Sequence, residues 1–190
     1  MSTEELHILL VCGDNARLSP LAAGLLARHA HDVGLALRVA SAGLVDDEQP
    51  FDQSVMWILK NRSITFDRGT SQPLDDRLVN GADLILTMTW QQAADVTAQF
   101  PHSSVFAIGY FGSALPARPD TLDTASWLDS LRNFPDAQAA EGRWDIKDPA
   151  GKPESAYLEL EVKLDHLIRR IVAKLGNGEA TATEPNVVRR

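Results

Sequence analysis

The segment from His7 to Ala30 constrains the fold of this 190-residue chain more than any other part of it. It begins with His7–Val11, a run of leucine and β-branched residues that is typical of a buried strand. A loop follows, and Ser19-Pro20 then opens a stretch with apolar residues at helical spacing. We expect Ser19 to be the N-cap and Pro20 the first helical residue, where a missing N–H costs no hydrogen bond. The pattern predicts a strand, a tight loop and a helix.

Cys12, the only cysteine of the sequence, falls between that strand and that helix. Backbone N–H groups converge at a helix N-terminus, and the helix dipole favours negative charge there. Such a place is expected to lower the pKa of a thiol and to hold a phosphate group. A single cysteine also excludes an internal disulfide and indicates a reducing compartment, so we expect a cytoplasmic protein.

Apolar runs and helical periods alternate along the rest of the chain. We expect further strands at 36–40, 82–88 and 104–108, and helices at 52–60, 89–99, 123–133 and 153–175. This alternation predicts one Rossmann-like α/β domain, a parallel sheet with right-handed crossovers and helices on both faces. The domain should span residues 1–175, and the small polar residues 176–190 should form a disordered tail.

Composition excludes several classes of function. The net charge is −8 and no basic stripe is present, which argues against nucleic acid as a partner. No apolar run is long enough for a transmembrane helix, and Met1–Glu5 lacks a signal-peptide pattern, so we expect no membrane partner. The five histidines are scattered without metal-ligand spacing, so we expect neither a metal nor another cofactor.

Four short motifs follow one another in a specific order. They are Cys12 with Asn15 and Ser19-Pro20, then Ser41-Ala42-Gly43, the run 82–88, and Asp148-Pro149 with Tyr157 downstream. From about Leu6 to Leu175 this order resembles the low-molecular-weight protein tyrosine phosphatases and the arsenate reductases built on their fold. The resemblance implies a four-stranded sheet in the order 2-1-3-4. The Cys12 loop would then lie at a topological switch point, where open α/β sheets bind ligands.

The resemblance also implies chemical roles for these residues. Cys12 would be the nucleophile that forms a phosphocysteine intermediate, and Asp148 the general acid that protonates the leaving group and then activates water. Asn15 and Ser41 would brace the loop, and Ser19 would steady the thiolate. The implied ligand is a phosphoprotein or a small phosphate or other oxyanion; no protein partner is named by the sequence. The phosphate loop would consist of Gly13, Asp14, Asn15, Ala16, Arg17, Leu18 and Ser19.

The loop departs from the family pattern at Leu18, where the family has its phosphate-binding arginine. Arg17 comes one residue early, and neighbouring helical positions differ by roughly 100° in direction, so we expect its side chain to point elsewhere as a surface charge. Asp14 stands where the family prefers glycine, and its carboxylate should repel phosphate and raise the thiol pKa. Ala150 replaces the aromatic residue that usually follows Asp-Pro. Losing a guanidinium at phosphoryl transfer costs about 10³–10⁵ in rate.

Three functions remain open on this sequence. We favour a catalytically impaired or inactive phosphatase homologue, a pseudophosphatase, with a binding or regulatory role. The second is an active phosphatase for phosphotyrosine or small aryl phosphates, in which Arg17 or Arg68 completes the site. The third is an arsenate reductase that uses its one cysteine with a small thiol; the thioredoxin-linked kind would need two more cysteines.

Overall fold

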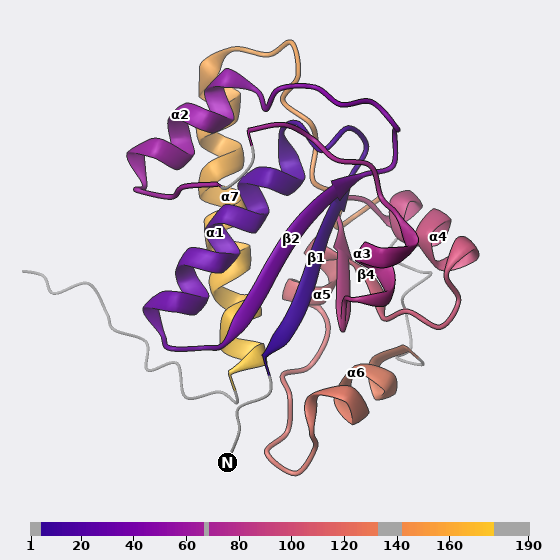
Figure 1. Cartoon of the computed structure of the whole chain (residues 1–190). Coiled ribbons are helices and arrows are strands. Elements are labelled where there is room, and N and C mark those ends of the chain that lie inside the picture. Colours follow the sequence, from indigo (N-terminus) through magenta and orange to yellow (C-terminus); the bar gives the residue numbers. More distant parts are fainter. Residues whose placement is uncertain (1–4, 67–68, 133–141, 177–190) are drawn as a thin grey trace, which may run out of the picture.

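The structure is a computed structural model that describes residues 5–66, 69–132 and 142–176. Each strand is followed by one or more helices, in line with the alternation that the sequence predicts (Figure 1). In chain order they are β1 (Leu6–Cys12), α1 (Leu18–Asp32), β2 (Leu37–Gly43), α2 (Gln53–Asn61), α3 (Asp76–Asn80), β3 (Leu84–Thr87), α4 (Trp90–Gln99), β4 (Val105–Ala107), α5 (Ile108–Ser113), α6 (Thr124–Arg132) and α7 (Glu154–Leu175).

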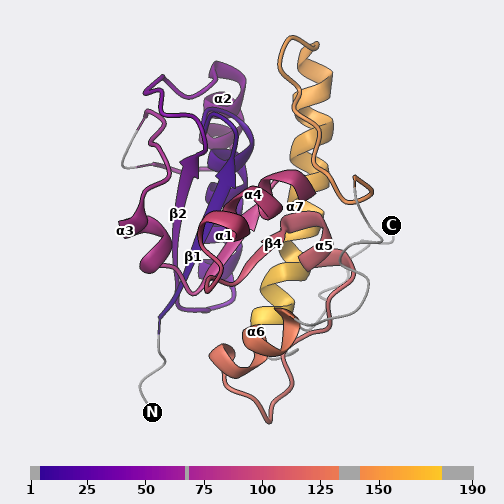
Figure 2. The same cartoon turned by 90° about the vertical axis from the view of Figure 1, so that its right-hand side faces the viewer.

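The four strands form one parallel sheet in the order β2-β1-β3-β4. This confirms the expected fold class and strand order. In the central strand, Leu9 pairs with Ala40 of β2 and with Ile85 of β3. Because the strands are parallel, the segments that follow β1 and β3 both leave the sheet at the carboxyl ends of the strands. Figures 1 and 2 place α6 at the opposite end of the molecule.

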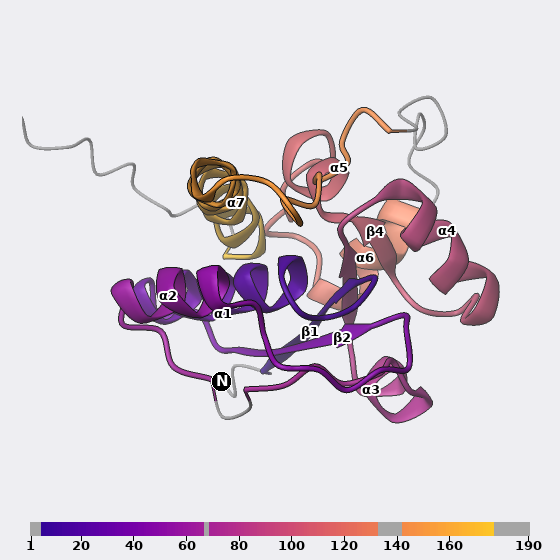
Figure 3. The same ribbon diagram turned by 90° about the horizontal axis from the view of Figure 1, so that it is seen from above.

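Two hydrophobic cores cover the two faces of the sheet. Ile8 and Leu10 of β1 belong to the larger core, with residues of α1, α2, α5 and α7. Leu9 and Val11 belong to the smaller core, with residues of α3 and α4. Figure 3 shows α1, α2, α5 and α7 on one side of the sheet and α3 on the other. Cys12 continues the alternation of Ile8 and Leu10, so its side chain turns towards α1.

Side-chain caps fix the start of two predicted helices. The Asp52 carboxylate accepts the Ser54 N–H at 2.8 Å at the start of α2. Thr89 and Gln92 form a reciprocal capping box at the start of α4. The predicted ranges of these helices are therefore right to within a residue. The apolar stripe of α7 is buried along its length, and Gly176 follows its last residue.

The structure corrects one boundary each of α1 and β2 and adds two short helices. The helix α1 begins at Leu18 with Arg17 at the N-cap, so the prediction that Ser19 caps it is wrong; the Ser19 hydroxyl turns to Cys12 instead. The strand β2 continues to Gly43 because its last residues stay paired with β1. The short helices α3 and α5 were not predicted, since five or six residues show too little periodicity.

Within the described ranges, no helix combines the length and the apolar character needed to cross a membrane. The tail predicted to be disordered lies outside the described residues, except for Gly176. The sequence also predicts a loop over residues 135–144, and residues 135–141 of it lie outside the described residues too.

Candidate active site

Cys12 lies at the end of β1, with 2% of its surface exposed. Its Sγ is 3.0 Å from Ser19 Oγ and accepts the Asn15 N–H at 3.3 Å. Asn15 Nδ2 donates to Ser19 Oγ at 2.9 Å, which leaves the serine hydrogen to be directed at the sulfur; the Ala42 carbonyl, at 3.5 Å, is the weaker alternative. This chain of donors holds the thiol in one orientation and stabilises its thiolate.

Asn15 also ties the loop to the strand beside it. Its φ of 52° lies in the left-handed region, which asparagine tolerates better than most residues. Its Oδ1 accepts the Gln72 N–H at 3.0 Å, and Gln72 Nε2 donates to the carbonyl of Ser41 at 2.8 Å. Gly43 permits this close approach, because a Cβ there would lie 3.0 Å from the Asn15 nitrogen. Sequence reasoning missed Gln72, and no local pattern could have indicated it. Ser41 takes part in this contact through its backbone carbonyl.

Arg17 is paired with two carboxylates. Its Nη2 lies 2.6 Å from Asp14 Oδ2, and its Nε and Nη2 reach Oδ1 and Oδ2 of Asp148 at 2.9 and 3.0 Å. Only 20% of the side chain is exposed, so the prediction of a surface charge is wrong. The physical reason is that Asp148, 131 residues later, lies over the start of α1 and offers both oxygens to the guanidinium fork. Hydrogen bonding to Asp148 and the charge of Asp14 raise the pKa of Arg17.

Asp148 reaches the loop because its segment is fastened to the carboxyl end of the sheet. The Ile146 N–H donates to the carbonyl of Met88, just after β3, at 2.9 Å. The Asp145 carboxylate accepts the N–H of Trp90, the first residue of α4, at 2.8 Å. These two bonds bring Asp148 to the same pocket as Cys12, where the family resemblance had implied it.

The pocket above the thiol has a volume of about 420 Å³. Leu18, with 5% of its surface exposed, gives the pocket a carbon wall and no hydrogen-bond donor. Asp14 Oδ1 lies 3.8 Å from the Cys12 sulfur and also accepts the Ala16 N–H at 3.0 Å. The lining consists of Cys12, Gly13, Asp14, Leu18, Thr89, Gln92, Gly142, Asp145, Ile146, Lys147 and Asp148.

Burial and hydrogen bonding shift the pKa values of Cys12 and Asp148 in opposite directions. Burial raises the pKa of Cys12, the charge of Asp14 adds to this, and the hydrogen bonds from Ser19 and Asn15 do not offset it. The expected lowering of this pKa is therefore wrong. Burial also raises the pKa of Asp148, but the hydrogen bonds from Arg17 and the Ala150 N–H outweigh it, so the net pKa falls below the usual aspartate value. Asp148 is thus held ionised, whereas a general acid must carry a proton.

Comparison with known proteins identifies the family. The family model for low molecular weight phosphotyrosine protein phosphatase matches residues 7–123. A probable low molecular weight protein-tyrosine-phosphatase, EpsP of Ralstonia nicotianae, is 33% identical over 136 residues, which cover 68% of this chain and 91% of that protein. The chain belongs to the low-molecular-weight phosphotyrosine protein phosphatase family.

Other members of the family agree in sequence and fold. The EpsP protein of Ralstonia solanacearum is 35% identical over 105 residues, covering 54% of this chain and 70% of that protein. The structure of the YwlE arginine phosphatase from Geobacillus stearothermophilus superposes with a TM-score of 0.67 and 26% identity, covering 90% of this chain and 93% of that one. The family match includes the Cys12 loop and ends before Asp148.

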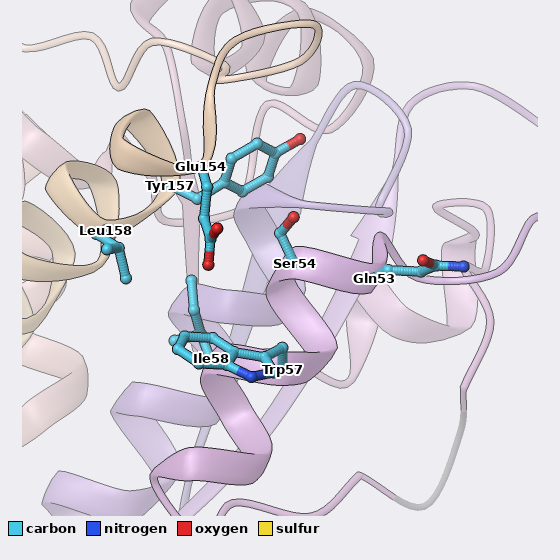
Figure 4. Close-up of a pocket in the computed structure, with 7 residues that line it drawn as sticks. All are labelled: Gln53, Ser54, Trp57, Ile58, Glu154, Tyr157 and Leu158. Atoms are coloured by element: carbon cyan, nitrogen blue, oxygen red, sulfur yellow. The ribbon is translucent and has the colours of Figure 1, made fainter.

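A separate hollow of about 180 Å³ lies between α2 and α7 of this phosphatase homologue (Figure 4). Its lining includes the exposed Trp57 and a single carboxylate, Glu154. The Tyr157 ring lines it, while the Tyr157 hydroxyl donates to Asp52 Oδ2 at 3.1 Å. No thiol lines this hollow, so the Cys12 pocket is the better candidate for an active site. In the ranges that the structure describes, no cluster of three or more His, Cys, Asp or Glu side chains could hold a metal ion.

Proposed function

We propose that this protein is a catalytically impaired or inactive phosphatase homologue of the cytoplasm, with a binding or regulatory role towards a phosphoprotein or a small oxyanion. One observation carries the proposal. The guanidinium of Arg17 is held between Asp14 and Asp148, while Leu18 offers the loop no donor.

Phosphoryl transfer to a thiolate needs positive charge where the oxyanion develops. Asp14, Arg17 and Asp148 together carry a net charge of −1 when all three are ionised, and a Cys12 thiolate would bring it to −2. A phosphate dianion that enters this pocket is repelled unless Arg17 leaves its carboxylates. If Arg17 moved away, the carboxylates of Asp14 and Asp148 would face the ligand unpaired, so the displacement itself costs free energy.

An active phosphatase is the second candidate. The short Cys12–Ser19 contact and the Asn15 N–H favour it, since these groups suit a working nucleophile. In that case the ligand would replace the carboxylates as the partner of Arg17, and Asp148 would regain a proton. Arg68, the other arginine considered for this role, lies outside the described residues. A single-cysteine arsenate reductase would need the same oxyanion loop, so the pairing of Arg17 counts equally against it.

Hydrolysis of a chromogenic aryl phosphate tests the proposal. Wild type and Cys12→Ser are compared from about pH 5 to about pH 8. We expect no turnover by the wild type above that of the variant. Turnover that disappears with Cys12→Ser would overturn the proposal, and its loss in Arg17→Ala would then identify Arg17 as the phosphate ligand. Arsenate reduction with a small thiol, abolished by Cys12→Ser, would instead support the reductase. Calorimetric titration with phosphotyrosine measures oxyanion binding separately.

A further inference from the structure

A third hollow, the lysine pocket, adjoins the Cys12 pocket at Asp148. It has a volume of about 200 Å³, and Lys147 and Asp148 line both pockets. The lysine pocket is open to solvent, and one segment of a ligand can therefore lie across the two. Its lining is Lys147, Asp148, Pro149, Lys152, Ala156, Glu159, Leu160 and Lys163.

Three ammonium groups surround this pocket. Lys147, Lys152 and Lys163 are three of the five lysines in a chain whose net charge is −8. All three are exposed, and none of the ion pairs formed within the described ranges includes them. The Lys163 ammonium donates to the backbone carbonyl of Asp145 at 3.4 Å. Their charge is therefore available to a ligand.

The neighbouring groups leave the pocket positive. Its two carboxylates, Asp148 and Glu159, stand against three lysines, and Arg17, which is shared with Asp14, offsets part of the Asp148 charge. The first turn of α7 also reaches the pocket through Ala156, and no side chain caps that helix, so its dipole adds positive potential. Glu154, in the same turn, lines the hollow between α2 and α7 instead (Figure 4).

We infer that the lysine pocket binds the acidic side chains of a protein segment that lies across the Cys12 pocket. Lysine ammonium groups are compact charges on flexible stems, without the rigid fork with which arginine grips one phosphate. Three of them spread over an open surface suit several carboxylates on an extended segment. The negative charge of the rest of the chain would repel such a segment and steer it to this patch. The inference does not depend on turnover at Cys12.

Binding of a glutamate-rich peptide tests this assignment. A fluorescein-labelled peptide is titrated with the wild-type chain at low ionic strength, and its anisotropy is compared with that of the same peptide carrying glutamine at each glutamate. The variant replaces Lys147, Lys152 and Lys163 by glutamine. An exposed ion pair contributes about 1.4-fold to fivefold in affinity, so the triple variant should bind about threefold to a hundredfold more weakly.

A charge-matched variant distinguishes binding at the lysine pocket from the long-range effect of net charge on peptide binding. It carries Arg38→Gln, Lys60→Gln and Arg77→Gln, three exposed positions outside both pockets, and should weaken binding by less than about twofold. Equal weakening in both triple variants would overturn the assignment, as would failure of the wild type to bind the acidic peptide. If the three lysines bind inorganic tripolyphosphate but the chain does not bind the peptide, the assignment of a protein segment is wrong and the ligand is a small anion. None of these outcomes depends on phosphatase activity.

Discussion

Replacing Leu18 by arginine tests whether one missing guanidinium would explain the loss of activity that we propose for the loop. Leu18 lines the Cys12 pocket, so an arginine at this position can reach the ligand. The same residue is 5% exposed and packs in the larger core, so the substitution loses apolar packing. We expect Leu18→Arg to lower the free energy of unfolding by about 2–4 kcal/mol.

The gain in activity should nevertheless be small. A free guanidinium in the loop would be worth about 10³–10⁵ in rate. Asp14, however, lies 3.8 Å from the Cys12 sulfur and would pair with the new arginine before a phosphate could. Relative to the Cys12→Ser rate, which the wild type is not expected to exceed, we expect Leu18→Arg alone to raise kcat/KM by less than about tenfold. Leu18→Arg combined with Asp14→Gly should raise it by about 10²–10³, the usual value of one oxyanion donor.

The assay compares kcat/KM for an aryl phosphate in wild type, in Leu18→Arg, in Asp14→Gly and in the double variant. Each is measured beside its own Cys12→Ser version as the blank, and thermal unfolding confirms that each is folded. A gain above about 10² in Leu18→Arg alone would show that Asp14 does not capture the arginine. A gain below about tenfold in the folded double variant would refute the explanation by loop charge altogether.

Three further outcomes follow from the contacts of the site. Because the pKa of Asp148 is lowered, its pairing with Arg17 stabilises the fold above about pH 4, and this stabilisation is lost as the pH falls through the lowered value. Arg17→Leu should therefore lower the free energy of unfolding in urea by about 0.2–1 kcal/mol at pH 7, and its difference from wild type should shrink towards pH 2. Burial and the charge of Asp14 raise the pKa of Cys12 above the ordinary thiol value, so alkylation by iodoacetamide should accelerate only at alkaline pH, and Asp14→Asn should move that acceleration to lower pH. A Cβ at Gly109 would lie 2.1 Å from a backbone carbonyl oxygen of the segment that carries Asp148, so Gly109→Ala should lower the unfolding free energy by about 1–3 kcal/mol and change the tryptophan fluorescence.

The elements that the sequence predicts best are those defined by local periodicity. The strand β1 contains the continuous apolar run 8–11, and α7 repeats apolar residues at helical spacing over about six turns; the run and the stripe are both buried as expected. Thr89 predicts the start of α4 because a capping residue acts within one turn. The strand order came from the resemblance, since parallel pairing joins residues far apart in the chain and has no local signature.

The start of α1 shows where local rules fail. Ser19-Pro20 is a good helix start by propensity, yet the helix begins one residue before Ser19. The Ser19 hydroxyl makes its bonds with Cys12 and Asn15 across the loop, so tertiary contacts replace the cap that the sequence suggests. Burial of the Cys12 thiol overrides the helix dipole in the same way, because desolvation acts through the whole surrounding core.

The pairing of Arg17 with Asp148 joins two properties that the sequence suggests are separate. The resemblance assigns Asp148 as the acid, and the spacing indicates that Arg17 is misplaced as a phosphate ligand. In the structure each is the partner of the other, so under the proposed function one contact would withhold both the phosphate-binding charge and the proton of the acid. A ligand that draws Arg17 away would also let the pKa of Asp148 rise, which means that the two functions can only return together. An inactive loop and a ligand-gated loop therefore differ in one quantity, the free energy needed to separate Arg17 from its two carboxylates.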